Sequence, residues 1–305
     1  MASSARLASE RTASEQIGIA CYSPRMKIGD WKISHCLAGR FGLDGGAMFG
    51  VVPKTMWERG LPPDEHNRVP MVMRVLLVQG NGKTIIVDVG SGTGYDAKMR
   101  QIYIFEETDH LRDAVRAAGV DPDSITDVML THLHFDHGAG AAEPHGDGWR
   151  LVFPKARHHV QKSQWEHALH PNARDKASYF EERIRILESE RVLELHDGPW
   201  SLGPGFDMHV FNGHTPGQQL PLLSGPEGKL FFTGDLFPFH HHVPPAWVMS
   251  YDLYPVTAME EKSAILERAA AEDWTFFFEH DAQVESCRIV REGKRYAVAG
   301  PVAAR

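Results

Sequence analysis

The chain has 305 residues, 42% of them hydrophobic and 24% charged, which is enough for one large globular domain or two average ones. Its net charge is −8 and it has no long run of lysine or arginine, which argues against nucleic acid and against an anionic membrane surface as partners. No apolar run approaches the roughly 20 residues that span a bilayer. The three cysteines, Cys21, Cys36 and Cys287, form no metal-binding pair or disulfide framework, so a reducing, cytoplasmic location is expected.

The N-terminal residues differ in composition from the rest. "MASSARLASERTASEQ" has no apolar core, so it is not a secretory signal, and we expect residues 1–26 to form a flexible arm. No linker interrupts residues 27–305, which we expect to form a single domain. Within it, residues 44–70 place glycines and prolines among apolar residues, a pattern that predicts a long structured loop rather than a helix.

Hydrophobic periodicity predicts strands in the next part of the chain. "VMRVLLVQ" and "TIIVDVG" flank Asn81-Gly82, which predicts a β-hairpin over residues 72–90. "HLRDAVRAAGV", residues 110–120, has helical spacing and ends at a glycine. "ITDVMLTH", residues 125–132, predicts a short buried strand that leads directly into a group of histidines.

The second half of the chain continues the alternation of strands and helices. We expect strands at residues 150–160, 206–214, 219–235, 275–281 and 286–300, and helices at residues 179–190 and 259–274. His158 and His159 fall in the first of these strands and are interpreted as structural. Strand-rich halves that each carry helices, joined without a linker, predict two sheets packed inside helical layers.

The stretch "HLHFDH" supplies four candidate metal ligands, His132, His134, Asp136 and His137. Alternate residues of a strand share a face, so the first two imidazoles can point the same way, and a turn would bring the next two side chains round. Histidine is the commonest zinc ligand, and carboxylate oxygen completes such sites. A histidine-rich surface loop is the alternative interpretation.

Three more donors stand where apolar runs end. His214 follows one run in "FNGH", Asp235 another in "LFFTGD", and His280 ends "TFFFEH". A satisfied core histidine would explain any one of them. Three donors in the same setting, together with "HLHFDH", favour a metal site.

The motifs HxHxDH, Gly-His, Gly-Asp and a final His, in this order, resemble the metallo-β-lactamase superfamily over about residues 27–295. The resemblance implies an α/β (α+β) fold, the four-layer αββα sandwich, with a two-metal site at one edge of its sheets. It is greatest to quorum-quenching N-acyl-homoserine lactonase-like and methyl parathion hydrolase-like members, on the segments "DGGAMFGVVPKTMWERGLPPDEHNRVPM" and "GDLFPFHHHVPPAWVMSYDLYP".

The resemblance assigns a role to each donor. It implies that the first metal is held by His132, His134 and His214, the second by Asp136, His137 and His280, and that Asp235 bridges the two. Asp88, in "VDVGSG", would organise the surrounding loops rather than bind metal. The expected cofactors are two divalent metal ions, zinc first, with iron, manganese or cobalt as alternatives for the same ligands.

Two cations about 3.5–4 Å apart can hold an activated hydroxide and stabilise an oxyanion. The expected protein is therefore a dinuclear metal-dependent hydrolase that opens a lactone or cleaves a small-molecule ester, as N-acyl-homoserine lactonases do. Asp136 and Asp235 are the expected catalytic residues, Asp136 by handling the proton on the leaving oxygen. An organophosphate (phosphotriester) hydrolase on the same site is one alternative, and a non-catalytic sensor or binding protein on this fold is another.

Substrate contacts are expected from the loop at residues 44–70, which the resemblance makes an active-site loop and the interface of a homodimer. Met48, Phe49, Trp57 and His242 are the candidate substrate-binding residues. Packing against the sandwich is the alternative for the first three, and a solvated histidine-rich loop is the alternative for His242. Familiar lactonases often have a tyrosine three residues after the bridging aspartate. This chain has Pro238 there, and Tyr251 or Tyr254 are the candidates to replace that phenol.

Overall fold

Strand β3 (Arg68–Gly80) shows how the sequence builds the layers of the protein. Its residues are buried over most of its length, and alternate side chains point to opposite faces. Leu76 and Val78 lie in a hydrophobic layer between two sheets, whereas Val75 and Leu77 lie in a second layer under helices. A strand that is covered on both faces has a continuous apolar sequence, as "VMRVLLVQ" does.

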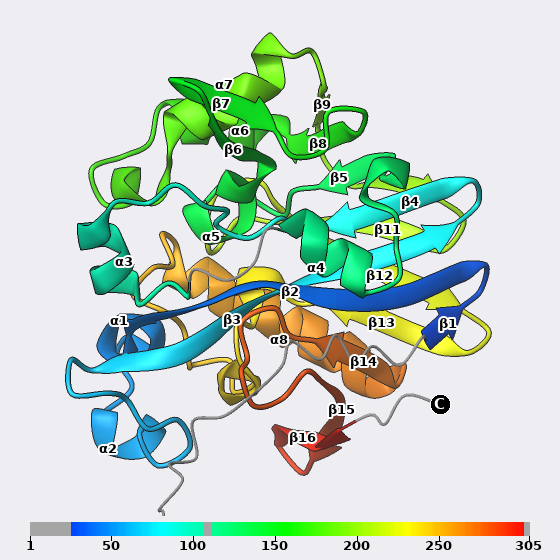
Figure 1. Ribbon diagram of the computed structural model, residues 1–305. Coiled ribbons are helices and arrows are strands. Elements are labelled where there is room, and N and C mark those ends of the chain that lie inside the picture. The colour runs from blue at the N-terminus through cyan, green and yellow to red at the C-terminus, as the bar shows by residue number, and fades with distance from the viewer. Residues whose placement is uncertain (1–25, 107–110, 302–305) are drawn as a thin grey trace, which may run out of the picture.

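The structure, a computed structural model, describes residues 26–106 and 111–301 (Figure 1). Its first sheet has seven strands in the order β1-β2-β3-β4-β5-β8-β9, of which β4, β5, β8 and β9 run parallel. Asn81 and Gly82, both with positive φ, form the predicted turn between β3 and β4. The other strands of this sheet are β1 (Met26–Ile28), β2 (Trp31–Asp44), β4 (Lys83–Val87), β5 (Asp127–Met129), β8 (Arg157–Gln161) and β9 (Leu193–His196).

The second sheet also has seven strands, which follow one another in chain order. All its neighbours pair antiparallel except β13 and β14, which pair in parallel with Phe231 opposite Phe276. Phe232 and Phe277 point towards the first sheet, and Phe231 and Phe276 point away from it. The strands are β10 (Trp200–Gly203), β11 (Phe206–Phe211), β12 (Gln218–Gly225), β13 (Gly228–Phe232), β14 (Trp274–Phe277), β15 (Ser286–Glu292) and β16 (Arg295–Pro301).

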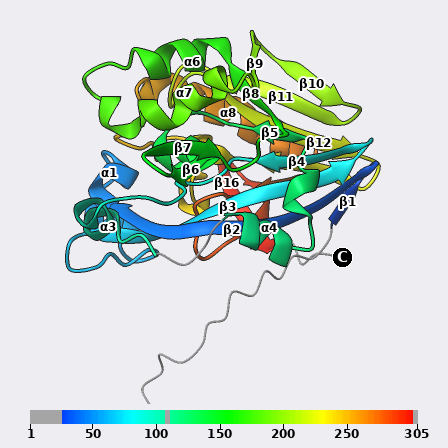
Figure 2. The ribbon, with the colours of Figure 1, turned by 45° about the horizontal axis from the view of Figure 1, so that its top comes forward.

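Helices cover the outer faces of the two sheets (Figure 2). Helix α8 (Pro255–Ala271) packs on the second sheet through Ile265, Leu266 and Ala269. The outer layer of the first sheet contains residues of α4 (Leu111–Ala117), α5 (Phe135–Gly138), α6 (Lys162–Leu169) and α7 (Glu181–Ser189). Two sheets between two helical layers confirm the predicted four-layer αββα sandwich.

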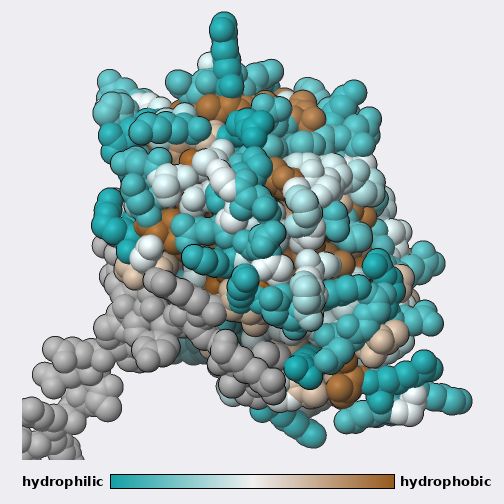
Figure 3. Space-filling view, turned by 90° about the vertical axis from the view of Figure 1, so that its right-hand side faces the viewer, coloured by the Kyte–Doolittle hydropathy of each residue, from teal (hydrophilic) through white to brown (hydrophobic). Residues whose placement is uncertain are grey.

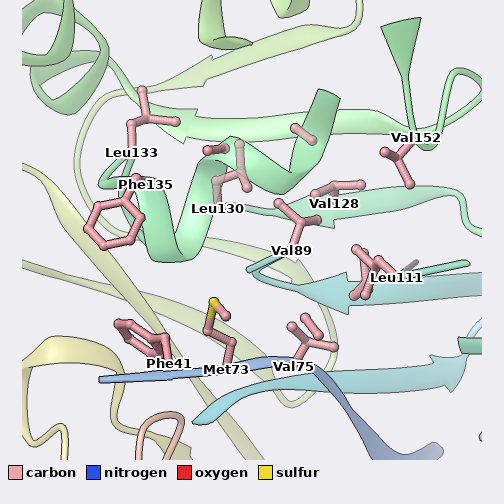
Figure 4. Packing of buried hydrophobic residues seen from close by; sticks show 14 of the residues in the cluster. Phe41, Met73, Val75, Val89, Leu111, Val128, Leu130, Leu133, Phe135 and Val152 are labelled. Carbon is pink, nitrogen blue, oxygen red and sulfur yellow. The ribbon is translucent and has the colours of Figure 1, made fainter. Parts of the chain in front are cut away.

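Helix α5 is anchored in the layer between the first sheet and its helices, seen closely in Figure 4. Phe135, at the start of α5, points towards Phe41 of β2, and the two ring centroids lie 6.3 Å apart. Leu133, just before the helix, is buried in the same layer. The helix that carries Asp136 and His137 is therefore fixed by the buried hydrophobic side chains that directly precede these polar residues.

The sequence pattern predicted a long loop rather than a helix at residues 44–70, but the structure has two short helices in this segment. It contains α1 (Gly45–Phe49) and α2 (Lys54–Trp57), each about one turn long, and its last residues begin β3. Asp44 starts α1 by accepting a hydrogen bond from the backbone N–H of Ala47 at 2.8 Å. The expected arm at residues 1–26 lies outside the described residues, except for Met26 in β1.

Other parts of the chain also differ from the expectation. The strand predicted over residues 150–160 is two strands, because β7 (Gly148–Leu151) leaves to pair with β6 (Ala142–His145) in a separate small sheet. Helix α3 (Ala97–Tyr103) was not predicted; it is seven residues long and none of its side chains is fully buried. The face seen in Figure 3 is mostly hydrophilic with scattered hydrophobic residues. No helix of the described chain is long and apolar enough to cross a membrane.

Candidate metal centre

The candidate ligands gather where strands of both sheets end. β4 runs parallel to β5 in the first sheet, and β11, β13 and β14 run in one direction in the second. The chain leaves the C-terminal ends of these strands into Asp88, His132, His214, Asp235 and His280, in that order. Because strands of one direction end at one edge, donors far apart in sequence meet there.

Three histidines form what we call the first metal position, His132, His134 and His214. The Nδ1 atom of His134 lies 3.0 Å from Nε2 of His132 and 3.1 Å from Nε2 of His214. Oδ2 of Asp235 lies 3.1 Å from His214 Nε2 and 3.8 Å from His132 Nε2. These four donors are buried and converge on one point.

Asp136, His137 and His280 form the second metal position, directly beside the first. The Nε2 atoms of His137 and His280 are 3.0 Å apart, and Oδ2 of Asp136 lies 3.8 Å from His280 Nε2. The other oxygen of Asp235, Oδ1, lies 3.1 Å from His280 Nε2 and 3.5 Å from His137 Nε2. Asp235 therefore faces the first position with one oxygen and the second with the other.

The donors fit a pair of metal ions. Tetrahedral zinc with Zn–N bonds of ~2.0–2.1 Å keeps its ligand nitrogens roughly 3.3 Å apart, close to the imidazole contacts of the first position. Within the described residues, Oδ1 of Asp235 is buried without a hydrogen-bond partner. Burial raises the pKa of Glu279, beside His137, to about 8, and the imidazoles of His137 and His280 offset only part of that effect. Two dications would add positive charge beside this carboxyl group.

The pKa values of the imidazoles follow their surroundings. Burial and the neighbouring imidazoles hold the pKa of His132 and His134 well below its usual value, which keeps them neutral and able to donate a lone pair. Burial lowers the pKa of His214 too, but Asp235 and Asp252 outweigh it and raise that pKa to about 9. A metal at this position would take the place of the proton that the carboxylates hold there.

Most of these imidazoles are held from behind by a contact to their second nitrogen. Nδ1 of His214 lies 2.9 Å from Asp252 Oδ1, and Nδ1 of His280 lies 2.9 Å from the carbonyl oxygen of Val72. Such contacts fix the orientation of a metal-binding imidazole and its tautomer. Sequence reasoning did not identify Asp252, which neither follows a strand nor belongs to a ligand motif. It also missed Glu279, although this residue directly precedes His280 in the run "TFFFEH".

Asp88 organises this edge, as the resemblance implied. Its carboxylate accepts hydrogen bonds from the N–H and the hydroxyl of Thr131, both at 2.7 Å, and lies 3.0 Å from Nδ1 of His137. Its φ of 60° is in the left-handed region, where aspartate is tolerated better than most residues. Gly140 lets the chain after α5 approach closely, since a Cβ there would lie 2.0 Å from the carbonyl oxygen of Val89.

A cavity of about 200 Å³ opens over the two metal positions. Its polar floor includes His134, Asp136, His214 and Asp235. Its remaining wall is formed by Leu43, Met48, Met71, Tyr103, Phe135, Arg174, Asp175, Ala177, Ser178, Met249, Ser250 and Tyr251. At least one donor of each position is therefore open to a small molecule that enters this cavity.

Of the four candidate substrate-binding residues, only Met48 lines the cavity. The ring of Phe49 stacks on Trp57 with centroids 4.9 Å apart, and it also stacks on His242 with centroids 5.0 Å apart. All three are fully buried, and His242 Nε2 contacts the carbonyl oxygen of Met48 at 2.9 Å. Phe49 and Trp57 therefore correspond to the packing alternative, and His242 packs with them while it contacts the backbone of Met48.

The two tyrosines proposed to replace a phenol at Pro238 differ in position. Tyr251 lines the cavity. Its pKa is raised mainly by burial, and the nearby charges of Asp136 and Asp235 raise it further. Tyr254 is 50% exposed and does not line the cavity. Tyr251 is thus the candidate that the structure places within reach of a bound molecule.

Comparisons with known proteins agree with this site. The family model of the metallo-beta-lactamase superfamily matches residues 74–280. The N-acyl homoserine lactonase of Bacillus thuringiensis is 28% identical over 192 residues, which cover 61% of this chain and 68% of that protein. A probable metal-dependent hydrolase from Staphylococcus aureus has a TM-score of 0.82 at 29% identity, over 91% of this chain and 100% of that one. AidC, a dizinc quorum-quenching lactonase in complex with a product, shares the fold with a TM-score of 0.73 at 22% identity, over 92% and 97% of the two chains.

Proposed function

The chain belongs to the metallo-beta-lactamase superfamily and is a metal-dependent hydrolase, and from this membership we propose that it is a dinuclear enzyme that opens a lactone or cleaves a small ester. An N-acyl-homoserine lactone is the substrate proposed first, because lactonases of that class are among the relatives. Zinc is the proposed metal at both positions, since imidazole and carboxylate ligands suit it.

One observation carries the proposal: the floor of the cavity is made of the candidate ligands themselves. His134, Asp136 and Asp235 line the same cavity as Met48 and Met249. An apolar pocket with a few convergent polar groups is the usual form of a small-molecule site. At about 200 Å³ the cavity is smaller than the ~300–1,000 Å³ of sites for drug-sized ligands. This volume favours a substrate whose small ring lies in the cavity and whose tail, if it is long, is directed outwards.

The chain's own residues would carry the proton and orient the substrate. Two bound dications would supply an activated hydroxide and polarise the carbonyl group. Asp136 lines the cavity and belongs to the second metal position, so its carboxylate is placed to hold the proton that the leaving oxygen needs. The Tyr251 hydroxyl group is the proposed donor to the same leaving oxygen, in the role that Pro238 cannot fill.

Turnover on three substrate classes tests the proposal. Metal-loaded protein is assayed on an N-acyl-homoserine lactone series, a phosphotriester and a simple aryl ester, with metal content measured on the same sample. We expect kcat/KM on the lactones to exceed the other two classes at least tenfold. Faster turnover of the phosphotriester would establish the organophosphate alternative instead. Two bound metals with no turnover on any class would favour the binding-protein alternative.

The proposed assembly is a homodimer through residues 44–70, and the proposed location is the cytoplasm. Val51 and Met56 of this segment are 86% and 54% exposed, which supports an apolar contact to a second chain. Sedimentation of the full chain at several concentrations tests the assembly, and a monomer throughout would refute it.

A further inference from the structure

Three potential metal ligands lie together outside the cavity. His240 and His241 are consecutive residues of the 3-10 helix η5 (His240–His242), and Asp281 comes from the turn that follows β14. One ligand atom from each of the three lies within 4.8 Å of the other two. None of these three residues lines the cavity over the two metal positions, so the cluster is a separate feature of the structure.

The carboxylate of Asp281 is fixed by the backbone around it. Its Oδ1 accepts hydrogen bonds from the N–H groups of Gln283 and Val284, both at 2.8 Å. Its Oδ2 accepts one from the N–H of His240, also at 2.8 Å. A carboxylate has about four lone-pair sites, so three are occupied by the backbone and one remains on Oδ2. Nδ1 of His240 lies 2.5 Å from that oxygen, and the two donor atoms therefore face each other in a fixed arrangement.

His241 is the residue that an ion pair between His240 and Asp281 leaves unexplained. Within the part of the chain that the structure describes, its Nδ1 is buried and has no hydrogen-bond partner. The centroid of its ring lies 3.9 Å from that of His240. Buried polar atoms normally have a partner, and leaving one unpaired costs free energy. A cation bound by both imidazoles would give Nδ1 of His241 that partner.

The Nε2 side of the His241 ring is closed by the loop at residues 44–70. A Cβ at residue 60 would lie 2.3 Å from Nε2 of His241, so Gly60 leaves the room that this imidazole needs. The carbonyl oxygen of Gly60 accepts a hydrogen bond from Nε2 of Gln283 at 3.1 Å. The end of α2, the helix η5 and the turn after His280 thus meet at this cluster.

The donors select a particular class of cation. Two imidazoles and one carboxylate suit zinc and other borderline transition metals, whereas calcium and magnesium require more oxygen ligands. A zinc ion with three protein ligands keeps its fourth position for water. The cluster is open enough for that water, because the side chain of His240 is 22% exposed while that of Asp281 is 3% exposed.

We propose that His240, His241 and Asp281 form a third metal site, which takes a zinc ion and holds η5 to the turn after His280. The site shares no residue with the two metal positions under the cavity, so it depends neither on the substrate nor on the proposed dinuclear centre. Zinc here would link residues 41 positions apart in the sequence, which restricts the unfolded chain. Zinc at this site therefore raises the Tm of the chain.

Zinc stoichiometry tests this site. The full chain is treated with chelator and dialysed against a series of zinc concentrations, and zinc and protein are then measured on the same sample. We expect His241→Ala to bind one zinc equivalent fewer than the parent chain, or to bind that equivalent at least tenfold more weakly. His240→Ala should show the same loss. Because the difference between two chains is read, the result does not depend on how many ions the dinuclear centre holds.

His145→Ala is the matched control, because His145 is an exposed histidine at the end of β6 and belongs to none of the sites. This variant should keep the stoichiometry of the parent. The Tm without metal checks that each variant folds, and added zinc should raise the Tm of the parent more than that of His241→Ala. Unchanged stoichiometry and affinity in both His240→Ala and His241→Ala would overturn the proposal. An equal loss in His145→Ala would also overturn it, because the zinc would then be bound by surface histidines in general. No turnover is measured, so failure of the lactonase assay leaves this result intact.

Discussion

Lys262 offers a prediction whose size follows from its burial. It lies on α8, is 2% exposed, and donates hydrogen bonds to the carbonyl oxygens of Trp247 at 2.6 Å and Pro244 at 3.3 Å. Burial lowers its pKa from 10.5 to about 7, and Asp252 offsets only part of that effect. The loop that it holds continues into Met249 and Tyr251 in the cavity wall.

This lowered pKa makes stability depend on pH. Below pH 7 the ammonium group is charged in both states, and the folded chain bears the full cost of burying it. Between pH 7 and 10.5 the unfolded chain holds one more proton than the folded chain, so the free energy of unfolding rises with pH, by up to about 1.4 kcal/mol for each pH unit. From pH 6 to pH 9 the gain is roughly 2–3 kcal/mol.

Urea unfolding of the parent chain and of Lys262→Met, both treated with chelator, measures this at pH 6, 7, 8 and 9. The other titrating groups are common to the two proteins, so the parent-minus-variant difference isolates Lys262. We expect that difference to move in favour of the parent by roughly 2–3 kcal/mol over the range. Lys155→Met, at an exposed lysine, is the control and should give a flat difference. A flat difference for Lys262→Met as well would refute the reasoning.

Three further predictions concern the site and its support. Asp235→Asn should abolish activity and metal binding at both positions while the domain stays folded by circular dichroism, and full activity would remove Asp235 from the site. Trp57→Ala should lower the free energy of unfolding by about 3–5 kcal/mol without changing the metal content, because it removes a ring stacked on Phe49, and an unaltered Tm would contradict the packing role. Tyr251→Phe should lower kcat on a lactone about 10–100-fold and leave the metal content intact. This is the size expected for the loss of one hydrogen bond to a developing charge. An unchanged kcat would exclude the phenol of Tyr251 from the reaction.

Sequence reasoning reached the candidate ligands because each has a local signal. His214, Asp235 and His280 each come after a strand core of apolar residues, and HxHxDH follows another. The periodicity of such strands also predicted the two sheets, since a strand such as β14 must be covered on both faces. The resemblance supplied the order of the layers.

The supporting residues could not be found in this way. Asp252 lies in an irregular loop, and its contact with His214 joins residues 38 positions apart. Phe49 and Trp57 lie on one-turn helices that are too short for a periodic pattern, so their direction depends on tertiary packing. The direction of a side chain on such an element is decided by its neighbours in space.

Each metal position draws donors from both halves of the chain, so bound cations would act as crosslinks across the seam of the sandwich. At the first position His134 meets His214, 80 residues later, and at the second His137 meets His280, 143 residues later. Closing loops of this length removes conformational freedom from the unfolded chain. Metal supply and mutational tolerance are therefore linked: a chain with both crosslinks in place can bear core substitutions that would unfold the same chain after the metals are lost.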